Sequence, residues 1–221
     1  GDTEPDNDFE VNERPGSNTL DRLRPLFHPR GIIVAGVSSH PGKFGFVAYH
    51  NLRRFGYSGN LYAINRDGAE VLGTPTLTSV SQVPSGAADL IFVCTPNESN
   101  VELLRASAAR GVKAAFVASG GYAETGLEGR RRQDELVKTA EGLGMVVAGP
   151  NGQGVISTPV TMCAQIVAPY PPEGSISVAS QSGNLVSSYL NYSVSTGVGV
   201  SKAIAAGNSA QLALPDYLEY F

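Results

Sequence analysis

The chain alternates between short, uninterrupted apolar runs and longer segments in which apolar residues recur every three to four positions. Uninterrupted hydrophobicity is typical of strands covered on both faces of a parallel sheet, whereas the longer period indicates amphipathic helices. Repeated β–α alternation predicts a doubly wound parallel α/β domain over residues 19–158. The predicted strands cover 32–37, 61–64, 90–94, 112–118 and 145–148, and the predicted helices cover 46–55, 101–110 and 127–143.

The two ends of the chain depart from this rhythm. Residues 1–18 are polar and acidic, which predicts a disordered leader, and a short helix over 20–27 is expected to end at His28-Pro29. The proline-rich segment 159–173 is interpreted as an interdomain linker. Residues 174–221 begin a second α/β domain, which we expect to be truncated because so few β–α units cannot close a sheet. Its predicted elements are a strand over 176–179, a helix over 183–195, an apolar stretch over 198–206 and a helix over 211–221.

The charge distribution argues against one class of partner. The chain has 16 basic and 20 acidic residues, and residues 1–19 hold six of the acidic ones against Arg14 alone. The rest of the chain is therefore close to neutral and offers no broad basic face, so nucleic-acid binding is not expected. Three arginines at 130–132 are followed closely by Asp134 and Glu135, and this run is interpreted as a solvated helix face.

Cysteine content and hydropathy indicate the cellular compartment and the kinds of site to expect. Cys94 and Cys163 make neither a disulfide framework nor a zinc-binding spacing. No apolar run approaches the roughly 18 residues of a membrane span, and no signal peptide is evident. We therefore expect a cytoplasmic protein with no membrane segment and no metal site.

The loop after the first predicted strand has the composition of an anion-binding loop. In open α/β sheets, ligands bind at the carboxyl ends of strands, where helix N-termini present free N–H groups and partial positive charge. Here glycines allow a tight turn and close approach, serines add hydroxyl donors, and a lysine adds a charge. These residues are Gly36, Ser38, Ser39, Gly42, Lys43 and Gly45. We expect the anion to be a diphosphate.

The pattern differs from the common nucleotide-binding loops. The loop lacks the dinucleotide G-x-G-x-x-G spacing, and Phe44 follows Lys43 where a P-loop has Ser or Thr for Mg²⁺. The second strand runs into Asn65-Arg66, whereas NAD sites place an acidic residue there to bind the ribose. An arginine suits a phosphorylated ribose, which both NADP and coenzyme A (CoA) carry.

Several motifs in register give the chain a resemblance to a known family. They cover residues 36–45, 65–66, 95–98, 119–126, 149–154, 180–184 and 207–208. Over roughly residues 20–221, the chain resembles the nucleoside-diphosphate-forming acyl-CoA synthetases, which are relatives of the succinyl-CoA synthetase α subunit. The resemblance implies a Rossmann-like CoA-binding domain, followed by a flavodoxin-like domain that carries a phosphohistidine.

The resemblance also assigns residues to parts of the ligand. The CoA phosphates would be held by the first loop, with Gly36, Ser38, Ser39, Gly42, Lys43, Phe44 and Gly45. The adenosine end would face Asn65 and Arg66, and the pantetheine path would be lined by Thr95, Pro96 and Asn97. The acyl and phosphoryl site would be bordered by Gly120, Gly121 and Asn151. The family commonly has Cys after this Asn, whereas the chain has Gly152, which leaves the acyl group open.

A second helix-start motif, at residues 180–183, adds Ser182 and Gly183 to Asn151 as the predicted catalytic set. Its N–H groups and helix dipole would stabilise a phosphate or a phosphorylated imidazole, and a local N-capping role for the serines is expected as well. The phosphorylated histidine is not matched, because His28, His40 and His50 all precede residue 51. The chain is therefore expected to bind CoA without completing the reaction.

The function implied by the resemblance is the CoA- and acyl-CoA-binding part of an NDP-forming acyl-CoA synthetase. This acid–CoA ligase would act through acyl phosphate and phosphohistidine. The other substrate would be a small carboxylic acid or acyl phosphate. ATP or ADP and Mg²⁺ would lie on an ATP-grasp domain or β subunit outside this chain, and we expect a homo- or hetero-oligomer.

Other functions compete with this interpretation. Similar domains fused to protein acetyltransferases would act as CoA-sensing regulatory modules. An NADP-dependent reductase is disfavoured by the longer loop and the missing G-x-G-x-x-G pattern. A serine hydrolase built on Ser182 fits worse, because Ser180 and Asn184 stand where a nucleophile elbow has glycine.

Overall fold

The computed structural model describes residues 16–166 and 169–221. The first helix, α1, is Gly16–Phe27, and it ends before His28-Pro29 as the sequence predicts. The predicted leader falls mostly on residues 1–15, which lie outside the described residues. Its last part, residues 16–18, belongs to α1, so the helix begins about one turn earlier than predicted.

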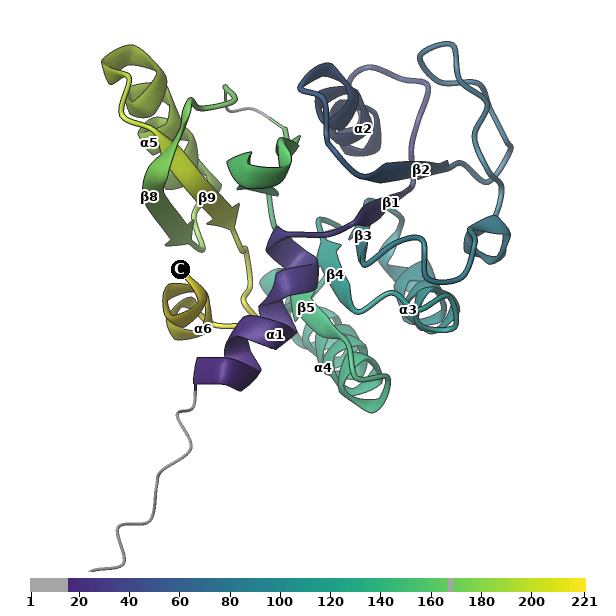
Figure 1. The fold of residues 1–221 in the computed structure, drawn as a ribbon. Coiled ribbons are helices and arrows are strands. Elements are labelled where there is room, and N and C mark those ends of the chain that lie inside the picture. The colour runs from purple at the N-terminus through teal and green to yellow at the C-terminus, as the bar shows by residue number, and fades with distance from the viewer. Residues whose placement is uncertain (1–15, 167–168) are drawn as a thin grey trace, which may run out of the picture.

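Five strands form a parallel sheet in the order β2-β1-β3-β4-β5 (Figure 1). β1 lies between β2 and β3, so Ile32 pairs with Leu61 on one side and with Leu90 on the other. Every residue of β1, β3, β4 and β5 is buried, as their uninterrupted apolar runs predict. The bounds are Gly31–Ala35 (β1), Asn60–Ile64 (β2), Leu90–Val93 (β3), Ala114–Val117 (β4) and Val146–Ala148 (β5).

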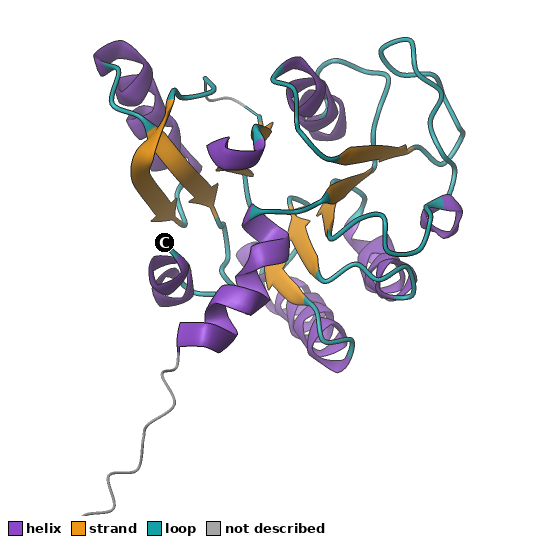
Figure 2. Cartoon of the chain, viewed as in Figure 1, coloured by secondary structure: helices purple, strands orange, loops and turns teal. Residues whose placement is uncertain are grey.

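Helices cover both faces of this sheet, which confirms the predicted doubly wound α/β class (Figure 2). On one face, α3 and α4 pack through Leu104 and Leu136. On the other face, α1 and α2 pack through Leu26 and Leu52. The helix bounds are Phe44–Arg54 (α2), Asn100–Ala108 (α3) and Leu127–Gly142 (α4).

A second, four-stranded sheet follows in the order β7-β6-β9-β8. β6 is antiparallel to both of its neighbours, whereas β8 and β9 are parallel. Helix α5 packs on this sheet through Val186 and Leu190, which share a buried cluster with Ile156. The bounds are Gly154–Ser157 (β6), Met162–Gln165 (β7), Glu173–Ser180 (β8), Gly183–Thr196 (α5), Val200–Ala205 (β9) and Leu214–Tyr220 (α6).

The β6–β7 hairpin differs from the sequence expectation, which places residues 154–158 in the first domain and begins a linker at residue 159. Both strands belong to the second sheet, and a 3-10 turn over Thr158–Val160 joins them. Two strands of four residues give little periodicity, and β6 finds its partner β9 only after about 40 intervening residues, a pairing that no local pattern reveals. The division into domains remains a prediction.

The two sheets share one buried core. Phe116 of β4 lies in the same cluster as Met162 of β7 and Ile204 of β9. The Asn51 side chain of α2 donates a hydrogen bond of 2.6 Å to the Gln165 carbonyl at the end of β7. This packing brings the loops that follow β4, β5, β8 and β9 to one edge of the molecule.

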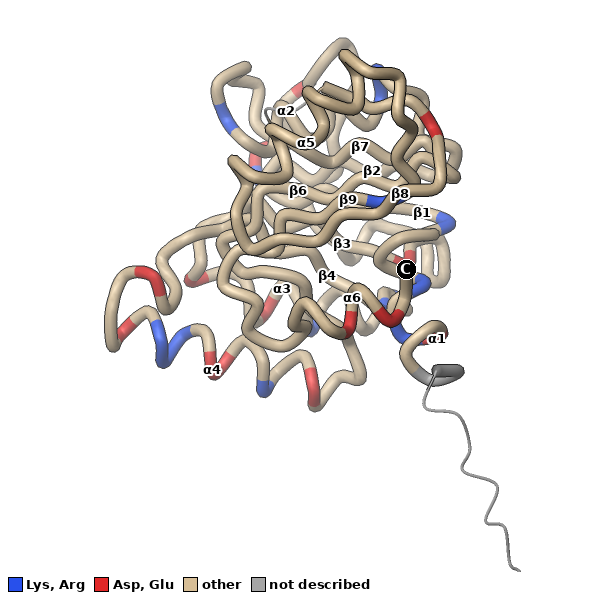
Figure 3. Tube along the Cα trace, turned by 90° about the vertical axis from the view of Figure 1, so that its left-hand side faces the viewer, with Lys and Arg blue, Asp and Glu red and all other residues tan. Residues whose placement is uncertain are grey.

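The surface charges of α4 are mixed in sign (Figure 3). Arg130 pairs with Asp134 at 3.5 Å, and Arg131 pairs with Glu128 at 3.4 Å. The arginine run is therefore a solvated helix face, as predicted. Within residues 16–166 and 169–221, no helix combines the length and the apolar character needed to cross a bilayer.

Candidate functional site

The strand order locates the expected ligand crevice. In a sheet ordered β2-β1-β3-β4-β5, the direction of winding reverses between β1 and β3. Ligands of open α/β sheets bind outside the carboxyl ends of the strands at this switch point. The loops after β1 and β3 carry residues 36–43 and 94–97, so the predicted CoA residues cluster where the topology requires them.

Two glycines let the β1 loop pack closely against its neighbours. Gly36 has φ +82°, and a Cβ atom there would lie 2.8 Å from the Cys94 carbonyl oxygen. Gly45, in the first turn of α2, would bring a Cβ atom to 2.0 Å from the Gly36 carbonyl oxygen. Both positions therefore require glycine for backbone packing, and the phosphate contact expected of Gly36 and Gly45 remains a prediction.

The polar groups of this loop face outward. The Ser38 hydroxyl accepts the His40 N–H at 3.0 Å. Ser39 and Lys43 are both exposed. Lys43 directly precedes α2, and no side chain caps this helix start. A Cβ atom on Gly42 would meet nothing within 4 Å, so the loop is open on that side. The free N–H groups at the start of α2 and the exposed Ser39 and Lys43 thus lie in one open loop, a composition that suits an anion.

Asn65 and Arg66, at the end of β2, have different roles. The Asn65 amide donates to the Val37 carbonyl at 2.8 Å, and its oxygen accepts the N–H groups of Asp67 and Ala69 at 2.9 and 3.2 Å. Its side chain therefore fixes the β1 and β2 loops relative to each other. Arg66 is exposed at the same edge. Of the two, Arg66 is the residue free to reach a ligand phosphate.

The β3 and β4 loops are bound together by side chains. The Ser119 hydroxyl donates to the Thr95 carbonyl at 2.5 Å. The Asn97 amide donates to the Gly120 and Gly121 carbonyls, both at 3.2 Å. Gly121 has φ +86°, and a Cβ atom there would lie 2.0 Å from the Asn97 amide nitrogen. The structure thus brings the predicted residues of these two loops together.

Thr95 and Pro96 lie at the start of the β3 loop, beside these contacts with the β4 loop. The Thr95 hydroxyl donates to the Asn100 side-chain oxygen at 2.6 Å, and the Asn100 amide donates to the buried Tyr122 hydroxyl at 2.9 Å. Pro96 is exposed. Thr95 therefore supports the loop from within, and Pro96 lies at its surface.

Glu124 anchors the glycine-rich β4 loop. Its carboxylate accepts the Gly121 and Tyr122 N–H groups at 2.9 Å each and the Asn208 amide at 3.0 Å. Partial burial alone would raise the pKa of Glu124, but the hydrogen bonds from Asn208 and from the backbone outweigh it, so its pKa is lowered. An ionised carboxylate is thus built into the loop.

Asn151 follows β5 in a left-handed conformation, with φ +58°. Its N–H donates to the Ser119 carbonyl at 3.0 Å. Its side-chain oxygen would lie 3.7 Å from a Cβ atom on Gly120. The predicted acyl-site residues Gly120, Gly121 and Asn151 therefore lie together in the structure.

Gly152 has a steric explanation. A Cβ atom there would lie 2.6 Å from the Phe116 ring, which stacks on Phe92 with centroids 4.9 Å apart and planes at 1°. The two buried rings fill the space that a side chain at residue 152 would need. Glycine at residue 152 thus fits the aromatic pair beneath the loop.

Ser182 and Gly183 begin α5 on the neighbouring sheet. The Ser182 hydroxyl accepts the Leu185 N–H at 3.3 Å, which confirms the local N-capping role. A Cβ atom on Gly183 would lie 1.8 Å from the Gln153 side-chain oxygen. The Gln153 side chain therefore lies directly against the start of α5 and joins it to the Asn151 loop. The catalytic role of Ser182 and Gly183 remains a prediction.

The three histidines have different surroundings. His28 makes a hydrogen bond of 2.6 Å through Nδ1 with the Tyr220 hydroxyl, so it has the structural role expected of it. His50 stacks on Phe46 with centroids 6.0 Å apart. His40 is exposed in the β1 loop, where it remains within reach of a ligand.

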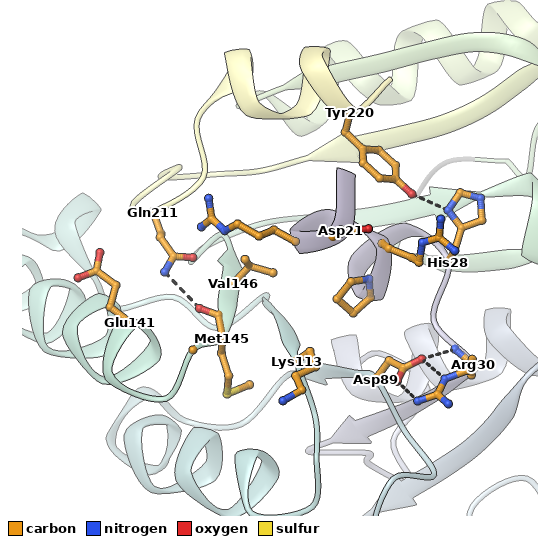
Figure 4. Close-up of a pocket in the computed structure, with 14 residues that line it drawn as sticks. Asp21, His28, Arg30, Asp89, Lys113, Glu141, Met145, Val146, Gln211 and Tyr220 are labelled. Atoms are coloured by element: carbon orange, nitrogen blue, oxygen red, sulfur yellow. Dashed lines mark hydrogen bonds and ion pairs between the residues drawn. The ribbon is translucent and has the colours of Figure 1, made fainter. Parts of the chain in front are cut away.

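A separate cavity of about 880 Å³ lies at the opposite, amino edge of the parallel sheet (Figure 4). Within it, Arg30 donates to Asp89 at 2.7 Å, and this pair ties the start of β1 to the start of β3. Burial opposes ionisation of Asp89, yet the Arg30 hydrogen bonds prevail and lower its pKa. None of the predicted ligand residues lines this cavity. Because ligands of such sheets bind at the carboxyl edge, the cavity is not the candidate site.

Glu124, Gln133 and Asn208 also take part in the candidate site, although they lie outside the predicted site set. Glu124 and Asn208 lie in motifs that carry the resemblance, but their type alone did not distinguish them from surface polar residues. Gln133 is seven residues into α4 and is buried, with 7% exposed, where its helical surroundings give no signal of a site.

Comparison with known proteins agrees with this geometry. A family model described as "CoA binding domain" matches residues 30–158, and one described as "Succinyl-CoA ligase like flavodoxin domain" matches residues 173–221. The chain is 37% identical over 195 residues to the ADP-forming acetate–CoA ligase I of Archaeoglobus fulgidus, covering 88% of this chain and 28% of that protein. It is 34% identical over 195 residues to the α subunit of the ADP-forming acetate–CoA ligase II of Pyrococcus furiosus, covering 88% and 42%.

A solved structure gives the same result. The dinucleotide-forming acetyl-coenzyme A synthetase 1 of Ca. Korarchaeum cryptofilum, in complex with phosphate and ADP, superposes with a TM-score of 0.83 at 32% identity, covering 90% of this chain and 42% of that one. The chain thus spans between 28% and 42% of the lengths of these relatives. Because the first model covers more than half of the 221 residues, the chain belongs to the CoA binding domain family.

Proposed function

We propose that the carboxyl edge of the parallel sheet binds CoA, with the pyrophosphate held by the β1 loop. The observation that carries the proposal is that Ser38, Ser39, Lys43 and the uncapped start of α2 belong to one largely exposed loop at the carboxyl end of β1. Fixed N–H donors and a lysine charge suit a diphosphate. Membership of the CoA binding domain family supports CoA as its carrier.

The adenosine end would lie toward β2. The exposed Arg66 would pair with the 3′-phosphate of CoA, while Asn65 keeps the two loops in place. The pantetheine chain would then pass Thr95, Pro96 and Asn97 toward the β4 loop. This path leads from the winding switch point to the seam between the two sheets.

The thioester would react at that seam, beside Gly120, Gly121 and Asn151. The start of α5, at Ser182 and Gly183, would supply N–H groups for the phosphate that attacks the acyl carbon. An oxygen of phosphate adds to the thioester carbonyl, the carbon–sulfur bond breaks, and the sulfur leaves on CoA, which yields an acyl phosphate. In the whole protein, a histidine would accept the phosphoryl group and pass it to ADP or GDP.

The relatives support a proposal for the activity and partners of the whole protein. The whole protein would be an NDP-forming acid–CoA ligase, with Mg²⁺ and the nucleotide on an ATP-grasp domain or β subunit, in a homo- or hetero-oligomer. The names of the relatives support acetate as a first acid to test. The unpaired thiols of Cys94 and Cys163 support a cytoplasmic location.

A thermal-melt series with CoA and NADPH tests the ligand. At about 100 times its dissociation constant, CoA should stabilise the protein by roughly 2.7 kcal/mol, because a ligand that binds only the folded state shifts the unfolding equilibrium. NADPH should leave the melting temperature unchanged, because the β1 loop lacks the dinucleotide spacing. A rise with NADPH and none with CoA would reverse the assignment.

A further inference from the structure

The loop after β9 is packed directly onto the loop after β5. Gly207 has φ +58°, and a Cβ atom there would lie 2.3 Å from the Asn151 carbonyl oxygen. The next residue, Asn208, donates its backbone N–H to the Pro150 carbonyl at 2.9 Å. This close contact, which only glycine permits, holds Asn208 at a fixed place beside the predicted acyl site.

The Asn208 side chain joins three other segments of the chain. Its amide nitrogen donates to the Glu124 carboxylate and to the Gln133 side-chain oxygen, both at 3.0 Å. Its oxygen faces the Asn151 amide at 3.5 Å. An asparagine amide has two N–H donors, and here two acceptors lie on that side. The orientation of the group is therefore determined, and it turns the Asn208 oxygen toward Asn151.

Both partners of Asn208 continue into the β4 loop. Glu124 accepts the N–H groups of Gly121 and Tyr122 at 2.9 Å. Gln133, which is buried, also accepts the Ala123 N–H at 3.3 Å. One side chain from the loop after β9 thus contacts the Asn151 amide and both side chains that accept the backbone N–H groups of residues 121–123.

We propose that Asn208 is a positioning residue for acyl and phosphoryl transfer. It orients the Asn151 amide directly and the glycine-rich β4 loop through Glu124. This inference rests on the proposed function, since it concerns the reacting end of the same site. Its own content is that the β9 loop, whose Asn208 side chain bonds to Glu124, Gln133 and Asn151, adjusts the turnover rate and leaves CoA affinity unchanged.

The first test compares Asn208→Ala with wild type in the full-length protein. ATP formation from acetyl-CoA, phosphate and ADP would be followed, together with the dissociation constant for CoA. We expect kcat to fall by about 10- to 100-fold, because small displacements of reacting groups cost rates of this size, while CoA affinity changes by less than about twofold. Asn191→Ala is the matched control, because among residues 16–166 and 169–221 this exposed asparagine bonds only to the Ser187 carbonyl of its own helix, and its kcat should equal that of wild type.

The second test separates positioning from folding. Asn208→Asp would place a second carboxylate beside Glu124 and should lower kcat further than Asn208→Ala does. Adding Glu124→Gln to Asn208→Asp restores one N–H donor between the two positions and should recover part of kcat. All variants would be assayed well below their melting temperatures, so a purely structural role would leave kcat unchanged. If Asn208→Ala does not fold, the comparison of the single with the double variant decides the question.

The outcomes distinguish the two proposals. An active wild type with unchanged kcat in Asn208→Ala, or with no recovery in the double variant, would overturn the role of Asn208 alone. A wild-type protein that neither binds CoA nor forms ATP would overturn the proposed function and this inference with it.

Discussion

Lys43 stands directly before α2, where its ammonium adds a full charge to the partial positive charge of the helix N-terminus. Its neighbours Ser39 and Gly42 are exposed as well, so the charge faces solvent on the side where a pyrophosphate would lie. A single charge placed in this way acts mainly on ligand affinity and little on folding.

Replacement of Lys43 by alanine should therefore weaken CoA binding by about 1–3 kcal/mol, which is the usual size of a charge-assisted hydrogen bond. Isothermal titration would measure it, with Lys138→Ala on exposed α4 as a control of equal charge change. Equal affinities for the two variants would show that Lys43 does not touch the ligand.

Helix α2 depends on a close backbone contact as well as on its apolar face. Gly45 in its first turn lies against the Gly36 carbonyl, and Gly36 in turn lies against Cys94 after β3. Three successive segments of the switch point are thus stacked with no side chain between them. This element-level packing determines where the helix N-terminus points.

Gly45→Ala should destabilise the protein by about 1–3 kcal/mol, because a methyl group 2.0 Å from a backbone oxygen forces the helix to move. Urea unfolding would measure the change. Gly142→Ala is the control, since a Cβ atom there meets nothing within 4 Å, and it should be neutral or stabilising by up to about 1 kcal/mol. A Gly45→Ala variant as stable as Gly142→Ala would show that α2 docks differently.

The elements also mark where sequence patterns work and where they do not. The continuous apolar runs of β1, β3, β4 and β5 and the period of α3 and α4 identify buried strands and amphipathic helices directly. The β6–β7 hairpin escapes detection because its strands are short and because β6 pairs with β9, which is remote in sequence. A proline-rich composition indicates a loop, and here a hairpin and its turn occupy part of it.

At the scale of the whole molecule, α1 and α6 pack against each other and connect the two sheets on the side opposite the candidate site. Phe27 of α1 stacks on Tyr220 of α6 with centroids 5.2 Å apart, and Tyr220 bonds to His28 at 2.6 Å. Burial lowers the pKa of His28, and the nearby charges of Lys202 and Arg24 lower it further. The folded state therefore resists protonation of this imidazole.

The pH dependence follows from that shift. Below the ordinary histidine pKa of 6.5, the unfolded chain binds a proton that folded His28 resists, so stability is complete above about pH 6.5 and falls as the pH drops toward the lowered value. Melting temperatures of wild type and His28→Gln between pH 7.5 and 5 would test this, with His40→Gln as the exposed control. The His28→Gln curve should be flatter, and parallel curves for wild type and His28→Gln would contradict the prediction.

The sequence by itself determined the fold class and the family resemblance, and it predicted an anion-binding β1 loop. Each depends on local features: apolar period, glycine and proline placement, and residue type next to a strand end. Only the tertiary structure decided that Asn65 holds loops together, that Gly45 serves backbone packing, and that Glu124, Gln133 and Asn208 meet. The Asn65 and Gly45 contacts arise because neighbouring strands and α2 of the first sheet pack together, and Asn208 reaches Glu124 and Gln133 only because the two sheets share one core.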